Sequence, residues 1–315
     1  MTDRSAMLTR FLTDAGVSDW IAEPIAADAS SRAYARLTAP AGDSLILMDA
    51  DPATGEDTTQ FVRIARYLTD HGFCAPRIIS ADPAGFLLLS DLGQQSLAQM
   101  ASRTSADQQV LYDAATDVLI QLDGAAPLEL PQIDPVRGGQ MVAITAELYA
   151  GSDPAPLVAA VQEALTRHAP LADRIALRDF HAENLIWRPH ASGSDRVGLL
   201  DFQDACLAPR GYDLASLLSD IRRDVPADII ARETARFARG TGETADDMAL
   251  RLAVLGAQRN LRILGVFCRL IAGGKGRYAT MMPRVWSVLL RDLGHPALAE
   301  LRDIVLRDIP APVAP

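Results

Sequence analysis

Three oxygen-bearing side chains, Asp179, Asn184 and Asp201, follow one another closely in the sequence. Asp179 and Asn184 belong to the stretch LRDFHAEN (177–184), and Asp201 follows the apolar run VGLL (197–200). Phosphoryl transfer from ATP needs a carboxylate that orients and deprotonates the attacking hydroxyl. It also needs amide and carboxylate oxygens that hold Mg²⁺ on the phosphates. We therefore interpret Asp179 as the base, and Asn184 and Asp201 as ligands of Mg²⁺.

Ordinary turn residues are the alternative interpretation of these stretches. Asp and Asn are common in turns and at helix caps, so either stretch alone could be structural. However, both stretches occur in the order that the chemistry requires, and only a short turn (188–196) separates them. Apolar runs at 174–177 and 197–200 predict strands that lead into the first stretch and deliver Asp201.

The C-terminal half resembles the aminoglycoside-phosphotransferase-type small-molecule kinases, which are relatives of the protein kinases. The resemblance rests on the two stretches above and on PRGYDLA (209–215). It implies a supporting role for Asp213 at the start of a helix. The family's first stretch often begins His-Gly-Asp, whereas this chain has Leu177-Arg178-Asp179, so the leading His is missing.

A narrower resemblance covers most of the chain. It rests on ADASSRAY (27–34), LMDA (47–50), LRDFHAENL (177–185) and QRNLRILG (258–265). These stretches are similar to those of bacterial anomeric kinases that phosphorylate N-acetylmuramate and N-acetylglucosamine at C1 during cell-wall recycling. The resemblance implies an ATP- and Mg²⁺-dependent kinase whose acceptor is an N-acetylated amino sugar. An aminoglycoside, choline or another small alcohol stays open as the acceptor.

One ion pair of the protein kinases is missing from the sequence. Their third strand carries a Lys that pairs with a Glu of the following helix, but this chain has Met48 there and no Glu in 58–71. We expect Ser30, Ser31 and Arg32 to bind the inner phosphates instead, through hydroxyls, backbone N–H groups and a guanidinium. The alternative is an ordinary hairpin turn. The missing pair is also the one observation that favours a nucleotide-binding pseudokinase.

Contacts with the adenine are implied by the resemblance. In the kinase-like family, the connector after the last strand of the N-terminal lobe binds adenine through its backbone, which places the base against Ser90, Asp91 and Leu92. The same residues could instead form a simple turn.

Further residues could contact the acceptor. His181 and Glu183 could touch the acceptor or the γ-phosphate, or they could hold the shape of the loop. Asp204 could bind a sugar hydroxyl, or it could be a solvated charge. Arg259 lies three residues before Arg262, on one face of a predicted helix. An Arg there could pair with the lactyl carboxylate of N-acetylmuramate, or the face could simply be exposed to solvent.

Composition narrows the classes of partner. The net charge of −10 argues against nucleic acid, because phosphate backbones select basic surfaces. The same charge gives no support to an anionic membrane surface, and no apolar run is long enough to span a bilayer. Three scattered Cys residues are typical of a reducing cytoplasm. We expect a cytoplasmic monomer with a small-molecule acceptor.

The predicted fold is α+β and protein-kinase-like, with two lobes. The N-terminal lobe (1–93) should be a small antiparallel sheet of five strands with a helix at 58–71. The C-terminal lobe (94–315) should be larger and mainly helical, and should include a helix at 141–148 and a long one that Thr244 caps and that ends near Ile271. The glycine-rich run 273–277 lacks the Walker spacing, which predicts a helix-ending turn.

Overall fold

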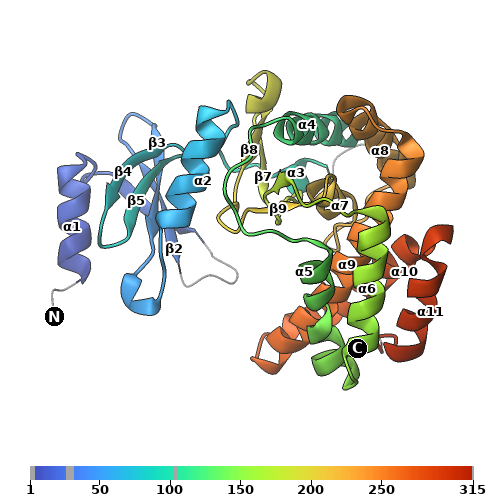
Figure 1. Ribbon diagram of the computed structural model, residues 1–315. Coiled ribbons are helices and arrows are strands. Elements are labelled where there is room, and N and C mark those ends of the chain that lie inside the picture. Colours follow the sequence, from blue (N-terminus) through green and yellow to red (C-terminus); the bar gives the residue numbers. More distant parts are fainter. Residues whose placement is uncertain (1–3, 26–31, 102–104, 314–315) are drawn as a thin grey trace. The chain divides into compact units, whose positions relative to one another are not determined.

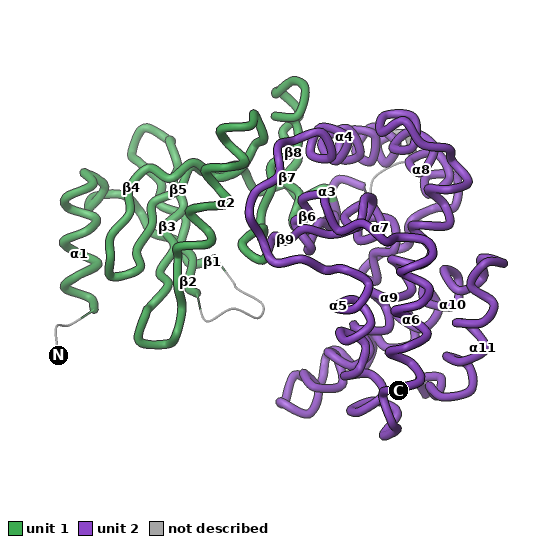
Figure 2. Tube along the Cα trace, viewed as in Figure 1, with its two compact units in different colours: residues 1–97, 184–204 green, residues 98–183, 205–315 purple. Residues whose placement is uncertain are grey.

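The structure is a computed structural model that describes residues 4–25, 32–101 and 105–313. Ser30 and Ser31, two of the predicted phosphate-binding residues, lie outside these ranges. The chain divides into two compact units, residues 1–97 with 184–204 and residues 98–183 with 205–315 (Figure 2). We call them the first and second unit. The predicted lobe boundary at residue 93 stays a prediction.

The first unit contains a five-stranded antiparallel sheet with the order β1-β2-β3-β5-β4 (Figure 1). Its strands are β1 (Ile21–Ile25), β2 (Ala33–Thr38), β3 (Ser44–Asp49), β4 (Ile78–Asp82) and β5 (Phe86–Ser90). The helices of this part are α1 (Arg4–Asp14), α2 (Thr59–Asp70) and the short η1 (Pro52–Thr54). The sheet and α2 agree with the expectation from alternating and helical hydrophobic spacing.

Burial explains the missing lysine of β3. Met48 is completely buried and lies between Tyr34 of β2 and Leu87 of β5. A charged side chain at this position would be desolvated without a partner, which is costly. Helix α2 likewise buries the apolar face that its spacing predicts, including Phe61, Ile64 and Leu68.

Residues 184–204 complete the first unit as a hairpin, which we call the Asp201 hairpin. Its strands are β7 (Leu185–Trp187) and β8 (Val197–Leu199), joined through η3 (Gly193–Arg196). Backbone hydrogen bonds fix the hairpin to preceding residues, since Leu199 donates to the Cys74 carbonyl at 2.8 Å and Trp187 to that of Gln95 at 2.7 Å. Phe202 stacks on Phe61 of α2, with ring centroids 5.1 Å apart. Position in the sequence alone would not have placed this hairpin with the sheet.

The second unit is mainly helical. Its helices are α4 (Ser105–Asp123), α5 (Pro135–Gln140), η2 (Thr145–Ala150), α6 (Ala155–His168), α7 (Tyr212–Leu218), α8 (Ala227–Thr241), α9 (Ala245–Ala272), η4 (Gly276–Met281), α10 (Met282–Leu293), η5 (Pro296–Leu298) and α11 (Ala299–Asp308). The strands β6 (Arg174–Ala176) and β9 (Cys206–Ala208) pair in antiparallel fashion, and α3 (Leu97–Met100) begins at the residue where the sequence of the first unit is interrupted. Thr244 caps α9 as predicted, and the run 273–277 follows the end of that helix.

The predicted helix at 141–148 is present in part, as a π-helix that begins and ends later than expected. The structure has the short α5 and the π-helix η2 in that region. Close packing on α9 is the physical reason, because a Cβ added at Gly265 would lie 2.7 Å from the backbone of Ile144 and Thr145. The Thr145 hydroxyl also bonds to the Leu261 carbonyl. Such tertiary contacts override local helical spacing.

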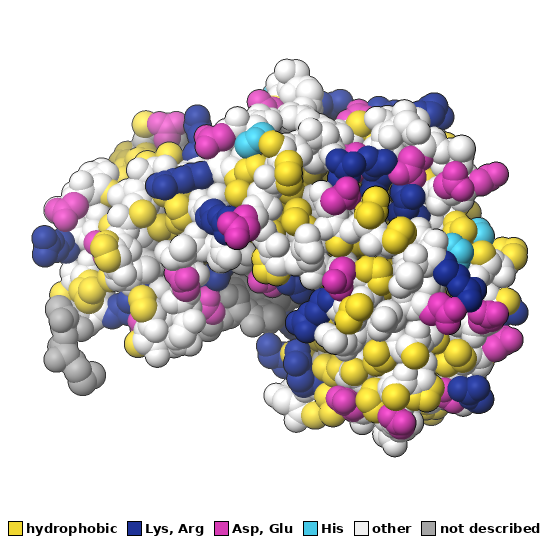
Figure 3. All heavy atoms as spheres, viewed as in Figure 1, with side chains coloured by type: hydrophobic (Ala, Val, Ile, Leu, Met, Phe, Trp, Pro, Cys, Tyr) yellow, Lys and Arg dark blue, Asp and Glu magenta, His cyan; other side chains and the backbone are white. Residues whose placement is uncertain are grey.

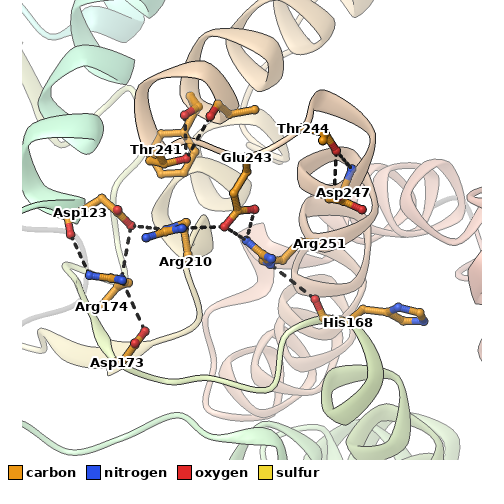
Figure 4. Close-up of polar contacts among 12 residues, drawn as sticks. Asp123, His168, Asp173, Arg174, Arg210, Thr241, Glu243, Thr244, Asp247 and Arg251 are labelled. Carbon is orange, nitrogen blue, oxygen red and sulfur yellow. Dashed lines mark hydrogen bonds and ion pairs between the residues drawn. The ribbon is translucent and has the colours of Figure 1, made fainter.

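An ion-pair network ties the base of β6 to helices α4 and α9 of the second unit (Figure 4). Arg210 bonds to Asp123 of α4 at 2.9 Å and to Glu243 at 2.7 Å, and Arg251 of α9 bonds to the same Glu243 carboxylate at 2.6 Å. Arg174 of β6 donates to the Asp123 carbonyl at 3.3 Å. These residues share partners and so form a network. Such a network contributes more to rigidity than isolated surface ion pairs do. The strand that leads to Asp179 is thus anchored at its base.

Candidate active site

Asp179 lies on a short loop that follows β6, and we call residues 177–183 the Asp179 loop. Asp213 of α7 fixes its first residues, since its two carboxylate oxygens accept hydrogen bonds from the backbone N–H groups of Leu177 at 2.6 Å and Arg178 at 2.9 Å. Burial raises the pKa of Asp213 to about 6. The residue holds the loop from the first turn of a helix, which is the supporting role that the resemblance implied.

Arg259 of α9 holds the Asp179 loop from a second direction. Its Nη1 donates to the Arg178 carbonyl at 2.8 Å, and its Nη2 lies 3.4 Å from Oδ1 of Asp179. Burial opposes ionisation of Asp179, but Arg259 and Arg178 outweigh it and hold the pKa of this carboxyl below its usual value. Asp179 is therefore an ionised carboxylate at neutral pH, and its side chain is 42% exposed. It can accept both a hydrogen bond and a proton.

His181 and Glu183 differ in their surroundings on the same loop. His181 is buried, and burial together with Arg222 and Arg259 lowers the pKa of its imidazole to about 3. It is thus neutral over the physiological range. Glu183 is half exposed and forms an ion pair with Arg222 at 3.1 Å.

Asn184 and Asp201 come together in the first unit. The Asn184 Nδ2 lies 3.2 Å from Oδ2 of Asp201, and Leu200 donates to the Asn184 carbonyl at 3.0 Å. The orientation of such an amide is assigned from its hydrogen bonds. A turned amide would present its oxygen beside the carboxylate, and this donor set suits a hard cation such as Mg²⁺.

The nucleotide would supply further ligands. Within the residues that the structure describes, no group of three His, Cys, Asp or Glu side chains could hold a metal ion. Mg²⁺ is commonly bound by one or two protein oxygens together with substrate phosphates and water. The pair Asn184 and Asp201 fits that mode.

Backbone strain marks both candidate segments. Among the described residues, Arg178 (φ 73°) and Asp201 (φ 59°) are the non-glycine residues with a left-handed backbone. Non-glycine residues rarely adopt this conformation, and the strain it costs is often found at functional sites. One of these residues directly precedes the predicted base, and the other is a predicted metal ligand.

Arg32 is held in place by a carboxylate that sequence reasoning missed. Its Nε lies 2.7 Å from Oε2 of Glu56, and Nη2 donates to the Asp57 carbonyl at 3.3 Å. Tyr34 is a further neighbour in the first unit, where it also lies within electrostatic reach of Asp201. The search for a partner covered 58–71, whereas Glu56 precedes α2 by three residues. A wider search of that connection would have found it.

The connector after β5 is stabilised by the side chain of Asp91. Its carboxylate accepts from Arg36 at 2.6 Å, from the Ser44 hydroxyl at 2.9 Å and from the Gly93 N–H at 2.9 Å. These bonds fix the backbone of the connector. Its N–H and C=O groups are therefore held in place independently of any side-chain contact to a ligand. Leu92 packs against β8, where a Cβ added at Gly198 would lie 3.0 Å from it.

Comparison with known proteins identifies the family. Residues 21–251 match the model of a family described as "Phosphotransferase enzyme family". The chain belongs to this family. An N-acetylmuramate/N-acetylglucosamine kinase of Caulobacter vibrioides is 34% identical, with 98% of each chain covered, and three further curated relatives have the same name. The expected family is confirmed, and the protein is a small-molecule phosphotransferase.

Solved structures support the fold of this phosphotransferase. A choline/ethanolamine kinase family protein from Mesorhizobium loti has a TM-score of 0.65 at 14% identity and covers 96% of this chain and 97% of its own. An amicoumacin kinase in complex with AMP-PNP, Ca²⁺ and Ami has a TM-score of 0.59 at 13% identity, with 92% and 94% covered. The predicted two-lobed α+β fold is thereby confirmed.

The predicted site residues of the phosphotransferase divide between the two units. Asn184, Asp201, Asp204 and Arg32 belong to the first, with the connector residues Ser90, Asp91 and Leu92. Asp179, His181, Glu183 and Arg259 belong to the second. Asp204 is exposed at the end of the Asp201 hairpin. The roles given to these residues stay predictions.

Proposed function

We propose that this phosphotransferase transfers the γ-phosphoryl group of ATP to the anomeric C1 hydroxyl of an N-acetylated amino sugar, N-acetylmuramate or N-acetylglucosamine, in peptidoglycan recycling. The observation that carries the proposal is the similarity, over nearly the whole of both chains, to a relative named for these two sugars. The enzyme would act in the cytoplasm as a monomer on a small-molecule acceptor.

Asp179 is the base in this proposal. Its carboxylate orients the C1 hydroxyl and accepts its proton while the hydroxyl oxygen bonds to the γ-phosphorus and ADP leaves. The support for this role is the ionised, half-exposed state of the carboxylate and the two elements that hold its loop. Such a reaction depends mostly on positioning and charge stabilisation.

Nucleotide binding falls to the first unit. Asn184 and Asp201 would hold Mg²⁺, which when bound neutralises charge on the phosphates. Arg32 would contact the phosphates with Ser30 and Ser31, and its bond to Glu56 would orient the guanidinium in place of the missing Lys–Glu pair. The backbone of Ser90, Asp91 and Leu92 would bind adenine. The Arg32–Glu56 pair weakens the case for a pseudokinase, because it offers an alternative to the Lys–Glu pair whose absence supports that hypothesis.

The acceptor would rest against the second unit. Glu183 is exposed enough to reach a sugar hydroxyl, and the exposed Asp204 of the Asp201 hairpin is the second candidate for such a bond. His181 and Arg259 are more deeply buried and would act on the acceptor through the shape and charge of the Asp179 loop.

Replacement of the base tests the mechanism. Asp179→Asn should lower kcat about 10²–10⁴-fold on N-acetylglucosamine, because the amide cannot accept the proton. The affinity for ATP should change little, as measured by calorimetry with Mg²⁺. The control is Asp173→Asn, an exposed carboxylate shortly before β6. A kcat close to that of the wild type would refute Asp179 as the base.

A further inference from the structure

A second arginine of α9 lies beside the Asp179 loop. Arg262 follows Arg259 by three residues and therefore shares its face of the helix. Its electrostatic neighbours are Tyr212, Arg178, Arg259 and Asp179. Figure 3 shows Lys and Arg side chains gathered on the second unit over the region where Figure 1 draws the C-terminal part of α9.

The two arginines differ in their partners. Arg259 is nearly buried, with 10% of its side chain exposed, and its guanidinium already bonds to the Arg178 carbonyl and to Asp179. Arg262 is half-buried, yet no hydrogen bond or ion pair joins it to any other residue that the structure describes. Burial and the neighbouring Arg178 and Arg259 lower the pKa of its guanidinium, so the charge is poorly solvated where it lies.

Positive charge predominates among the charged neighbours of Arg262. The guanidiniums of Arg178 and Arg259 lie within electrostatic reach of the Asp179 carboxylate, and Arg262 lies within reach of all three residues. Asp213, which lies within electrostatic reach of Arg259 and Asp179, uses both oxygens to accept from the backbone of the Asp179 loop, and burial raises its pKa to about 6. His181 is neutral because its pKa is lowered to about 3. Within the described part of this cluster, Arg262 is therefore an arginine that no carboxylate binds.

We propose that Arg262 binds a carboxylate of the acceptor and gives the enzyme its preference for an anionic sugar acid over the neutral sugar. A guanidinium matches the two oxygens of a carboxylate with a pair of parallel hydrogen bonds. A half-buried arginine without a partner supplies such a bond without first breaking an internal ion pair. The inference rests on the proposed function. The group that Arg262 would bind is the lactyl carboxylate of N-acetylmuramate.

The test compares two acceptors that differ in this carboxylate. We expect Arg262→Met to lower kcat/KM for N-acetylmuramate about 10–100-fold, the loss typical of a hydrogen-bonded charge, mostly through KM. The value for N-acetylglucosamine should stay within about threefold, which also verifies that the variant is folded. Arg262→Lys keeps the charge but not the planar fork of the guanidinium. Its kcat/KM for N-acetylmuramate should therefore lie between those of the wild type and Arg262→Met.

Arg269→Met is the matched control, because Arg269 lies on the same helix two turns later and is exposed. It should leave both sugars unaffected. If Arg262→Met lowered kcat/KM equally for both sugars and raised the KM for ATP, the inference would be overturned in favour of a contact with the phosphates. An unchanged ratio between the sugars would also overturn it. Wild-type enzyme that phosphorylates neither sugar would instead refute the proposed function and, with it, this inference.

Discussion

At the level of single residues, Asp179 shows how one side chain can be both ionised and held in place. Its carboxylate lies beside Arg259, whose other hydrogen bond fixes the backbone at Arg178. The arginine thus acts on the charge of Asp179 and on the conformation of the residue before it, which has a positive φ of 73°. Arg259 is a positioning residue for the predicted base.

Substitution of Glu56 tests whether the Arg32–Glu56 pair replaces the missing Lys–Glu pair. Glu56→Gln should raise the KM for ATP about tenfold, because the neutral amide holds Arg32 less firmly. The KM for the sugar should not change, since Glu56 belongs to the first unit and would act only on the nucleotide. The measurement is steady-state kinetics with ATP and sugar varied in turn.

The control for Glu56 is Glu23→Gln on the exposed strand β1. This variant should behave as the wild type does. If Glu56→Gln left the KM for ATP unchanged while lowering stability, Glu56 would hold only the fold of the first unit, and Arg32 would lose its support as a phosphate-binding residue.

At the level of secondary-structure elements, the Asp179 loop depends on the start of α7. Gly211 precedes this helix with a left-handed backbone, and a Cβ there would lie 3.2 Å from Leu252 of α9. The glycine allows the chain to enter α7 in close contact with α9, so that Asp213 reaches the loop. An alanine at position 211 would be strained as well as crowded.

Asp213 predicts a pH dependence. Its folded-state pKa is raised by burial to about 6, so its contribution to stability is present at low pH and declines as the pH rises through about 6. Activity should depend on pH in the opposite direction. The ionised carboxylate accepts the two N–H groups more strongly than the neutral acid does, so kcat should fall as the pH drops through about 6.

Asp213→Asn provides the check on this pH dependence. The variant should have a kcat about 10–100-fold lower at pH 8, and the decrease near pH 6 should disappear. Asp179 should not cause that decrease, because its pKa is lowered. A pH–kcat profile of Asp213→Asn that kept the wild-type decrease would assign it to another group.

The sheet and the long helices could be predicted because their signals are local. Strands β1–β5 follow alternating or continuous apolar runs, and α9 has a Thr cap at its start and glycines at its end. The π-helix η2 could not be predicted, because it depends on how closely Gly265 lets α9 approach a distant segment.

In the candidate site too, some residues could be predicted from local sequence and others depend on tertiary contacts. Asp179, Asn184 and Asp201 are recognisable because their spacing is fixed by chemistry within two short stretches. Glu56, and the difference between Arg259 and Arg262, depend on contacts between residues far apart in the sequence. Helical spacing placed both arginines on one face, but only the structure shows that Arg259 bonds to Asp179.

For the whole molecule, the net charge is −10, whereas the surroundings of Arg262 on α9 are rich in positive charge. Arg262 has Arg178 and Arg259 as electrostatic neighbours in the second unit, so an anionic ligand beside it would meet a local positive field. The acidic total argues against nucleic acid, while the local field suits a small anionic substrate. None of the described helices is both long and apolar enough to cross a membrane.

The most direct test of the account is ADP release by the purified protein with ATP and Mg²⁺ across a panel of acceptors. The panel contains N-acetylmuramate, N-acetylglucosamine, the methyl glycoside of N-acetylglucosamine, kanamycin and choline. The account predicts turnover on the two free N-acetylated sugars and its loss on the methyl glycoside, in which C1 is blocked. Turnover only on kanamycin or choline, or equal turnover on the methyl glycoside, would contradict it.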